Sequence, residues 1–140
     1  MAARVRDIME TKLVTISASE RMSTLEDIMT LGHVRHMPVV QGGRLVGVVS
    51  ERDLLRASLS ELSRHHDDER RAFLHVVEIA RVMSTPPIVI EPDATIEEAA
   101  SIMAEKKIGC LPVVDGDQLV GLVTETDVLR WVAGVAPVEG

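Results

Sequence analysis

Residues 47–56 (GVVSERDLLR) return almost unchanged as residues 121–130 (GLVTETDVLR). Each copy begins with an apolar run, passes through a hydroxyl residue and reaches an aspartate three positions later, as Ser50 and Asp53 and again as Thr124 and Asp127. An apolar run that ends in serine or threonine predicts a strand leading into a helix, with the hydroxyl residue as the N-cap. The aspartate then falls in the first helical turn, where negative charge is favourable.

Two interpretations of this pattern are open. In the first, the aspartates only stabilise the N-termini of two helices. In the second, an anionic ligand lies at each helix N-terminus, where the hydroxyl and the backbone N–H groups face a phosphate. The carboxylate would then accept two hydrogen bonds from neighbouring hydroxyls of a sugar. Because both copies carry the pattern, we expect both to have the same role.

The repeat extends over most of the chain. A shift of 74 residues aligns residues 5–56 with residues 79–130 without a gap, and 17 of the 52 aligned pairs are identical. Because a copy of this size is small for an independent core, we expect the two copies to pack on each other as a pseudo-symmetric unit. The expected organisation is a first repeat at 5–56, a helical linker at 57–78, a second repeat at 79–130 and a tail at 131–140.

Each copy predicts the element order β-α-β-β-α. The first strand is expected at residues 13–16 and again at residues 88–90. Two apolar, β-branched runs then flank a short Gly-containing turn, which predicts a hairpin. The hairpins would join residues 37–40 to 44–49 and residues 111–114 to 118–123.

A helix is expected between the first strand and the hairpin of each copy. Its apolar residues recur at helical spacing, as Met22, Leu25 and Met29 and then as Ile96, Ala99, Ala100 and Met103. Thr95 with Glu98 forms a capping-box pattern at the start of the second helix, and Ser23 with Glu26 suggests a shifted one for the first.

The linker at residues 57–78 contains neither glycine nor proline. Phe73, Val76, Val77 and Ala80 recur at helical spacing, which predicts a helix docked on the core over its second half. His75 lies among apolar neighbours and is expected to be a packing residue. We expect the linker as a whole to be an arm that tolerates surface substitution.

Residues 65–68 (HHDD) are a candidate metal-ligand cluster. Adjacent residues on a helix or turn point in different directions, however, and a solvated polar turn explains the run equally well. No metal site is therefore predicted.

Composition excludes several classes of protein. The 140 residues are 46% hydrophobic, which fits one globular domain. A net charge of -7 argues against a nucleic-acid partner, because such binding depends on lysine and arginine. No apolar run approaches the roughly 20 residues of a membrane span, and the N-terminus lacks the apolar segment of a signal peptide, so a cytoplasmic protein is expected. The single cysteine, Cys110, precedes an apolar run and is expected to be a packed thiol.

The repeated motifs resemble a known family, the tandem cystathionine-β-synthase (CBS) domain pair or Bateman module. They are residues 7–9 (DIM), 35–40 (RHMPVV) and 47–53 (GVVSERD), repeated as 81–83 (RVM), 110–114 (CLPVV) and 121–127 (GLVTETD). The resemblance covers nearly the whole chain. It implies a mixed α/β (α+β) fold of two repeats packed sheet to sheet. It also implies two related sites in the cleft between the repeats for adenosine-type ligands such as AMP, ADP, ATP or S-adenosylmethionine.

In this family each site combines residues of both copies. The resemblance implies one site with Ser50, Asp53, Val48, Val49, Ile88 and the backbone of Gly109 and Cys110, with Arg35 toward the phosphates. It implies a second site with Thr124, Asp127 and Val14, with Arg35 or His36 near the phosphates. Since the repeat aligns Arg35 with Gly109 and His36 with Cys110, we expect unequal sites, the second binding multiply charged nucleotides more tightly.

Three functional classes remain open for these residues. The favoured one is a regulatory module that binds an adenine nucleotide, requires no other cofactor and signals occupancy to a protein partner in trans. The second is a purely structural dimerisation module with empty sites. An enzyme is disfavoured, because the sequence has no nucleophile–base pair, no metal-ligand spacing and no P-loop. A homodimer is expected for both the regulatory and the structural module. A single copy would leave apolar helix faces uncovered near Leu55, Leu129 and Trp131.

Overall fold

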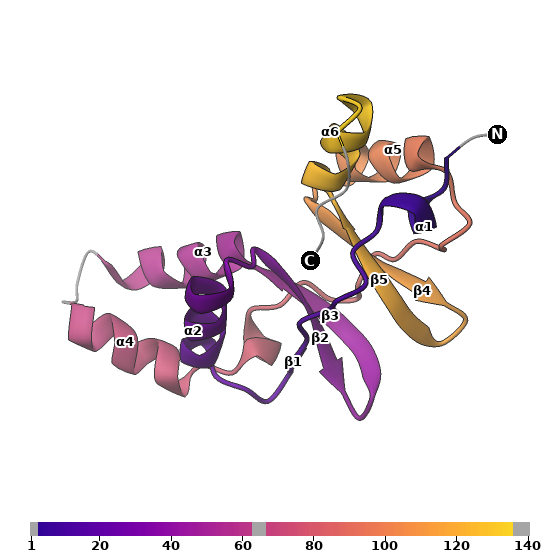
Figure 1. The fold of residues 1–140 in the computed structure, drawn as a ribbon. Coiled ribbons are helices and arrows are strands. Elements are labelled where there is room, and N and C mark those ends of the chain that lie inside the picture. The colour runs from indigo at the N-terminus through magenta and orange to yellow at the C-terminus, as the bar shows by residue number, and fades with distance from the viewer. Residues whose placement is uncertain (1–2, 63–66, 136–140) are drawn as a thin grey trace. The chain divides into compact units, whose positions relative to one another are not determined.

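The chain forms two compact units in the computed structural model, which describes residues 3–62 and 67–135 (Figure 1). The first unit is Val14–Pro87, and the second unit joins Met1–Leu13 to Ile88–Gly140. The units do not coincide with the repeats of the sequence, because the opening residues of each repeat fold with the body of the other. The predicted mixed α/β class with two repeats is confirmed.

The first unit contains a three-stranded sheet in the order β1-β2-β3. Strand β1 (Ile16–Ser17) runs parallel to β2 (His36–Gln41), which pairs antiparallel with β3 (Arg44–Ser50). Glycines 42 and 43 join β2 to β3 with positive φ angles of 58° and 77°, which glycine adopts without steric cost. The hairpin prediction is therefore confirmed. The first strand is shorter than predicted and begins three residues later.

The helices of the first unit are α2 (Met22–Gly32), α3 (Glu51–Leu62) and α4 (Asp67–Val76), followed by a 3-10 helix, η1 (Ile79–Arg81). Met22, Leu25 and Met29 of α2 are all buried, so the predicted apolar face is confirmed. They pack in one core with residues of the sheet such as Met37 and Val49.

The second unit repeats the hairpin and two of the helices. Strands β4 (Cys110–Asp115) and β5 (Gln118–Thr124) pair antiparallel between α5 (Ile96–Lys106) and α6 (Glu125–Val132), and a short helix, α1 (Val5–Ile8), precedes them in sequence. Both hairpins have a register shift at the same repeat position, after Val39 and after Val113. The strand predicted at residues 88–90 is reduced to an isolated parallel bridge between Ile90 and Val113.

The two predicted helix caps have different outcomes. Thr95 is the N-cap of α5, and its side chain accepts a hydrogen bond from the Glu98 amide (3.1 Å). The cap predicted at Ser23 is wrong, because α2 begins one residue earlier than Ser23, after Arg21. Ser23 lies inside the helix, 3% exposed, and its hydroxyl shares a hydrogen bond with His75 Nδ1 (3.2 Å). A contact with a residue 52 positions away thus replaces the local cap.

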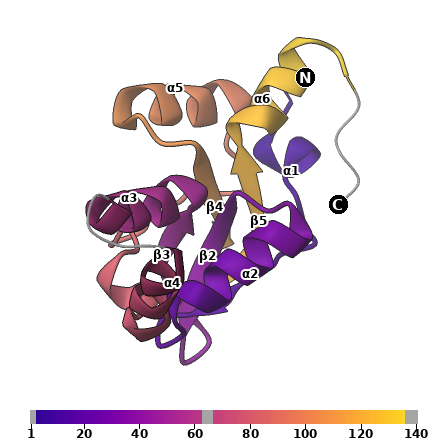
Figure 2. The same cartoon turned by 90° about the vertical axis from the view of Figure 1, so that its left-hand side faces the viewer.

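Helix α4 docks on the first unit as predicted, although only part of the predicted face packs against the core. It lies alongside α2 (Figure 2), and its fully buried residue is Leu74. Phe73 and Val77 pack against the same core, whereas Val76 is 69% exposed. The predicted face assumed that one helix continues to Ala80, but α4 ends at Val76 and the chain turns there.

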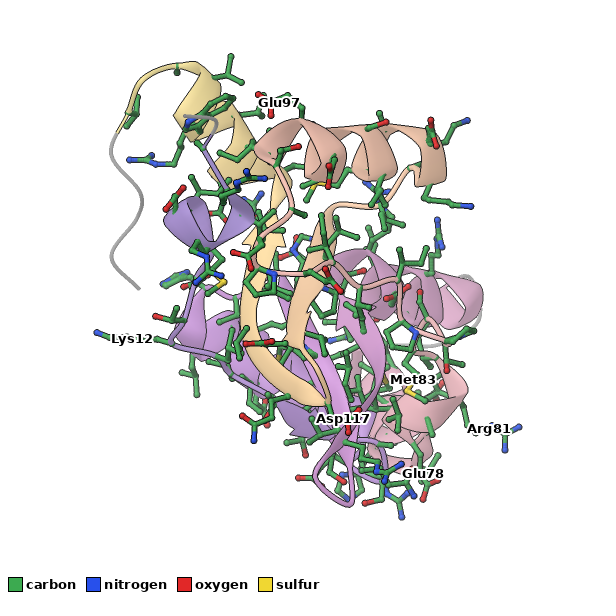
Figure 3. The ribbon with its side chains drawn as sticks, turned by 90° about the vertical axis from the view of Figure 1, so that its right-hand side faces the viewer. Lys12, Glu78, Arg81, Met83, Glu97 and Asp117 are labelled. Atoms are coloured by element: carbon green, nitrogen blue, oxygen red, sulfur yellow. The ribbon has the colours of Figure 1, made fainter. Side chains whose placement is uncertain are left out.

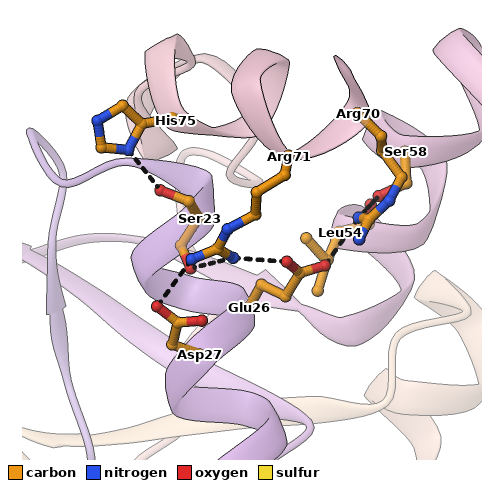
Figure 4. Close-up of polar contacts among 8 residues, drawn as sticks. All are labelled: Ser23, Glu26, Asp27, Leu54, Ser58, Arg70, Arg71 and His75. Carbon is orange, nitrogen blue, oxygen red and sulfur yellow. Dashed lines mark hydrogen bonds and ion pairs between the residues drawn. The ribbon is translucent and has the colours of Figure 1, made fainter. Parts of the chain in front are cut away.

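A group of ion pairs fixes α4 to α2 (Figure 4). Arg70 and Arg71 each donate to a different carboxylate oxygen of Glu26, over 2.8 Å and 2.6 Å, and Arg71 also reaches Asp27 (2.9 Å). Burial alone would raise the pKa of Glu26, but the hydrogen bonds and charges of the two arginines outweigh it, so the pKa is lowered. Helix α4 is therefore an integral part of the first unit, as the predicted docking on the core requires, and its ion-paired face does not fit an arm that tolerates substitution throughout.

The opening segments of the two repeats lie against the hairpins of their units. Glu10 exchanges two backbone hydrogen bonds with Leu122 of β5, and Ser84 exchanges two with Val48 of β3. At each contact the strand has a glycine, and the methionine before Glu10 or Ser84 lies where the side chain of a larger residue would be, Met9 at Gly121 and Met83 at Gly47. Met83 is labelled in Figure 3.

We expect Gly47→Ala to lower the free energy of unfolding by about 1–3 kcal/mol, because the added Cβ has no room. It would lie 2.8 Å from Met83 Sδ and 2.8 Å from the Ser84 carbonyl oxygen, which the Val48 amide holds in place. The matched variant Gly121→Ala meets the Met9 side chain at 2.5 Å but the nearest backbone oxygen only at 3.1 Å. Since a methionine side chain can move aside, Gly121→Ala should lower the free energy of unfolding, measured in urea, by less than Gly47→Ala does. Equal losses would contradict this explanation.

Candidate functional site

The first candidate site is the junction of β3 and α3. The Asp53 Oδ2 atom accepts hydrogen bonds from the Ser50 amide (2.8 Å) and the Ser50 hydroxyl (3.0 Å). In return, the Asp53 amide donates to the Ser50 hydroxyl oxygen (3.1 Å). This reciprocal arrangement, a capping box, closes the helix N-terminus and holds the carboxylate in one orientation.

The junction of β5 and α6 has the same geometry. The Asp127 Oδ2 atom accepts from the Thr124 amide (2.8 Å) and hydroxyl (2.9 Å), and the Asp127 amide donates to the Thr124 hydroxyl oxygen (3.2 Å). The predicted N-cap role of Thr124 and Ser50 is therefore confirmed in both copies.

Each cap uses only one of the two carboxylate oxygens of its aspartate. Both donors reach the same oxygen, Oδ2, and among the residues that the structure describes none donates to Oδ1 of Asp53 or Asp127. Both side chains are only half-buried. A carboxylate with one oriented, unoccupied oxygen at a helix N-terminus can accept hydrogen bonds from a bound hydroxyl group.

The residues before each hairpin lie beside the cap of the same unit. The Glu51 amide donates to the Arg35 carbonyl oxygen (2.8 Å), and His36 is the partner of Ser50 in the β2–β3 ladder. In the second unit the Glu125 amide donates to the Gly109 carbonyl oxygen (2.9 Å). The structure thus brings Arg35 and His36 together with Ser50.

The equivalent pair in the second unit is Gly109 and Cys110. Cys110 is the ladder partner of Thr124 and is buried, as expected for a packed thiol. The combinations implied by the family resemblance, in which Gly109 and Cys110 serve the Ser50 site and Arg35 or His36 serves the Thr124 site, join residues of different units. They stay predictions.

The remaining predicted residues lie on strands or at the points along the chain where one unit ends and the other begins. Val49 is fully buried and packs in the core of the first unit, so Val48 faces the opposite side of β3. Val14 and Ile88 are both exposed apolar residues. Each is the first residue of a segment where the chain passes from one unit to the other.

Sequence analysis missed Glu10. Its backbone pairs with Leu122, two residues before the Thr124 cap. Burial raises the pKa of Glu10, and the nearby negative charge of Asp127 raises it further. The available signal was the repeat itself, which aligns Glu10 with the uncharged Ser84.

One hollow in the second unit lies against a predicted site residue, and a second hollow there does not. A cavity of about 40 Å³ lies against Asp127 and is lined by Ile8, Arg130, Trp131 and Val135 as well. A larger, open hollow of about 380 Å³ lies between residues 89–91, the start of α5 and the end of β4. It contains none of the predicted site residues.

Within residues 3–62 and 67–135, no group of three or more His, Cys, Asp or Glu side chains could hold a metal ion. The candidate run at 65–68 lies largely outside the described residues, which exclude His65, His66 and the side chain of Asp67. No helix in the described part of the chain has the length and apolar character needed to cross a membrane.

Comparison with known proteins gives consistent matches over nearly the whole chain. The family described as "CBS domain" matches twice, at residues 5–60 and 78–134. The CBS domain-containing protein YhcV of Bacillus subtilis is 30% identical over 123 residues, which cover 88% of this chain and 81% of YhcV.

Two solved structures have the same fold. The AcuB protein of Vibrio cholerae has a TM-score of 0.77 at 30% identity, and the match covers 96% of this chain and 93% of AcuB. CBSX2, solved in complex with AMP, has a TM-score of 0.76 at 27% identity, with 94% and 96% covered.

Proposed function

Because this chain belongs to the CBS-domain family, we propose that it is a regulatory module that senses adenosine-type nucleotides and transmits their binding to a protein partner. The observation that carries the proposal is the reciprocal cap, present twice with the same geometry. In each cap one oxygen of an oriented carboxylate has no donor among the described residues. The AMP complex of CBSX2 supports an adenine nucleotide as the ligand class.

In the proposed complex each site takes residues from both repeats, as the family resemblance implies. Asp53 and Asp127 accept hydrogen bonds from the ribose hydroxyls. Where a ligand carries phosphate, the phosphate lies toward the first turn of α3 or α6, whose N–H groups have no acceptor within the helix. Exposed Val14 and Ile88 would cover the faces of the adenine rings, with Val48 beside them. Backbone groups near Val49, Gly109 and Cys110 would bind the edge of the base.

The proposal assigns no catalytic step to the chain. In each cap the hydroxyl of Ser50 or Thr124 donates to the aspartate carboxylate and accepts from the aspartate amide, so both side chains are held as a helix cap. The module would therefore act through binding alone.

The test is to identify what the purified protein binds. Small molecules released on denaturation would be analysed by mass spectrometry, and AMP, ADP, ATP and S-adenosylmethionine would be added in calorimetry and thermal unfolding. We expect at least one of these to bind and to raise the melting temperature. Absence of any adenosine-type ligand in both experiments would favour the structural module with empty sites.

A homodimer is part of the proposal. Leu129 and Val132 on α6 are 66% and 70% exposed, and Leu55 on α3 is 54% exposed, so both units present apolar helical surface to solvent. Sedimentation at micromolar concentration should give about twice the 15.3 kDa mass of one chain. A monomer mass there would contradict the dimer and leave the nucleotide proposal standing.

A further inference from the structure

The two capped junctions have the same geometry but differ in the charged residues around them. In the first unit, the opening segment that pairs with β3 carries Ser84, and the first turn of α3 contains Arg52. In the second unit, the equivalent positions are Glu10 and Thr126. At these two positions the Thr124–Asp127 junction therefore has one more negative charge and one cation fewer than the Ser50–Asp53 junction.

Glu10 is held close to the Thr124 cap by its own backbone. Two hydrogen bonds with Leu122, of 2.8 and 2.9 Å, fix it beside β5, two residues before Thr124. Ile8, two residues before Glu10, lines the 40 Å³ cavity together with Asp127. The segment that carries Glu10 thus packs against the same helical turn as the candidate ligand-binding aspartate.

Among the residues that the structure describes, no cation compensates the charge of Glu10. Its side chain is half-buried, and in the described part of the chain no lysine, arginine or histidine forms an ion pair with it. The raised pKa of Glu10 agrees with a carboxylate that burial and a like charge both disfavour. By contrast Glu26, which is similarly buried in the first unit, pairs with two arginines.

We infer that Glu10 is a specificity-determining residue that makes the Thr124–Asp127 site select adenosine-type ligands without phosphate groups, whereas the Ser50–Asp53 site, with Ser84 in the equivalent position, accepts phosphorylated ones. The inference rests on the proposed function and deepens it. It reverses the order of affinities that the sequence suggested, because the structure places Arg35 beside Ser50 and Glu10 beside β5. A phosphate at the Thr124 site would approach two carboxylates.

The test compares ATP with adenosine by calorimetry, so that phosphate charge is the variable. The Thr124–Asp127 site is measured alone in an Asp53→Ala background, where Glu10→Gln removes the charge and keeps the size of the side chain. We expect ATP affinity to rise about tenfold relative to adenosine affinity, as a unit charge at a few ångströms from a phosphate would give. The matched control is Glu105→Gln, which removes an exposed charge on α5 and should leave the ratio unchanged.

The reciprocal experiment introduces the charge into the first unit. In an Asp127→Ala background, Ser84→Glu should lower the ATP-to-adenosine affinity ratio about tenfold, whereas Ser84→Gln, of nearly the same size, should leave it unchanged. If wild-type protein binds adenosine or ATP but neither Glu10→Gln nor Ser84→Glu changes the ratio, the inference is wrong and the proposed function stands. If neither compound binds to wild type, the inference is overturned, whereas the proposed function is overturned only if AMP, ADP and S-adenosylmethionine fail to bind as well.

Discussion

Replacing Leu74 by alanine is expected to lower the free energy of unfolding by about 2–5 kcal/mol, the range for removing a large aliphatic side chain from a packed core. Leu74 is fully buried and belongs to the core of the first unit together with Met22 and Leu25 of α2. The void would lie between α4 and α2, two helices that the Glu26 ion pairs also hold in place. Urea unfolding followed by circular dichroism measures the loss.

The matched control for Leu74→Ala is Val76→Ala, two residues further along the same helix. Val76 is 69% exposed, so its truncation should change the unfolding free energy by less than about 0.5 kcal/mol. Both variants introduce alanine, the best helix former, so neither should lose stability through helix propensity. A loss below about 1 kcal/mol for Leu74→Ala would mean that α4 contributes little and that the linker is the tolerant arm predicted from sequence.

Local patterns in the sequence predicted local structure well. The hydroxyl and aspartate of the Ser50 and Thr124 caps are three residues apart, so the whole interaction lies within one stretch of chain. The hairpins likewise depend on neighbouring runs and on glycine at turns that require positive φ. Family resemblance then added what these patterns could not, which is the expectation of an adenosine-type ligand.

Interactions between distant segments were the ones that sequence analysis missed. Ser23 looked like a cap because its neighbours fit the pattern, but its partner is His75 on another helix. Leu74 was overlooked because the periodicity of residues 73–80 was extended past the end of α4. Periodicity describes one element at a time and does not show where that element ends or what covers it.

The most informative miss concerns the opening segments of the repeats. The alignment of residues 5–13 with 79–87 shows that they are equivalent, but not that each folds with the body of the other repeat. Glu10 therefore looked like an ordinary charged residue of the first repeat, while it lies beside β5 of the second. Charge differences at equivalent positions become meaningful only once the neighbouring strand is known.

Substituting both Asp53 and Asp127 by alanine is expected to abolish the stabilisation that a nucleotide gives. A ligand that binds only the folded state at 100 times its Kd stabilises by about 2.7 kcal/mol, and the double variant should lose all of this. Thermal unfolding with and without AMP or ATP measures the difference. Loss of the caps should also lower the stability of the ligand-free protein, by about 1 kcal/mol for each helix.

The control separates ligand binding from helix stabilisation. Glu51 and Glu125 precede the two aspartates by two residues, lie in the same helical turns and are exposed. Their double substitution by alanine removes the same charge near the same helix dipoles without touching a cap, and it should keep the nucleotide-induced shift. If the aspartate double variant still responds to nucleotide as strongly as wild type, the carboxylates serve the helices alone. The two double variants change the net charge and the charge near the helix dipoles equally. If the aspartate variant loses the response to nucleotide while the glutamate variant keeps it, the two aspartates therefore act directly on the ligand.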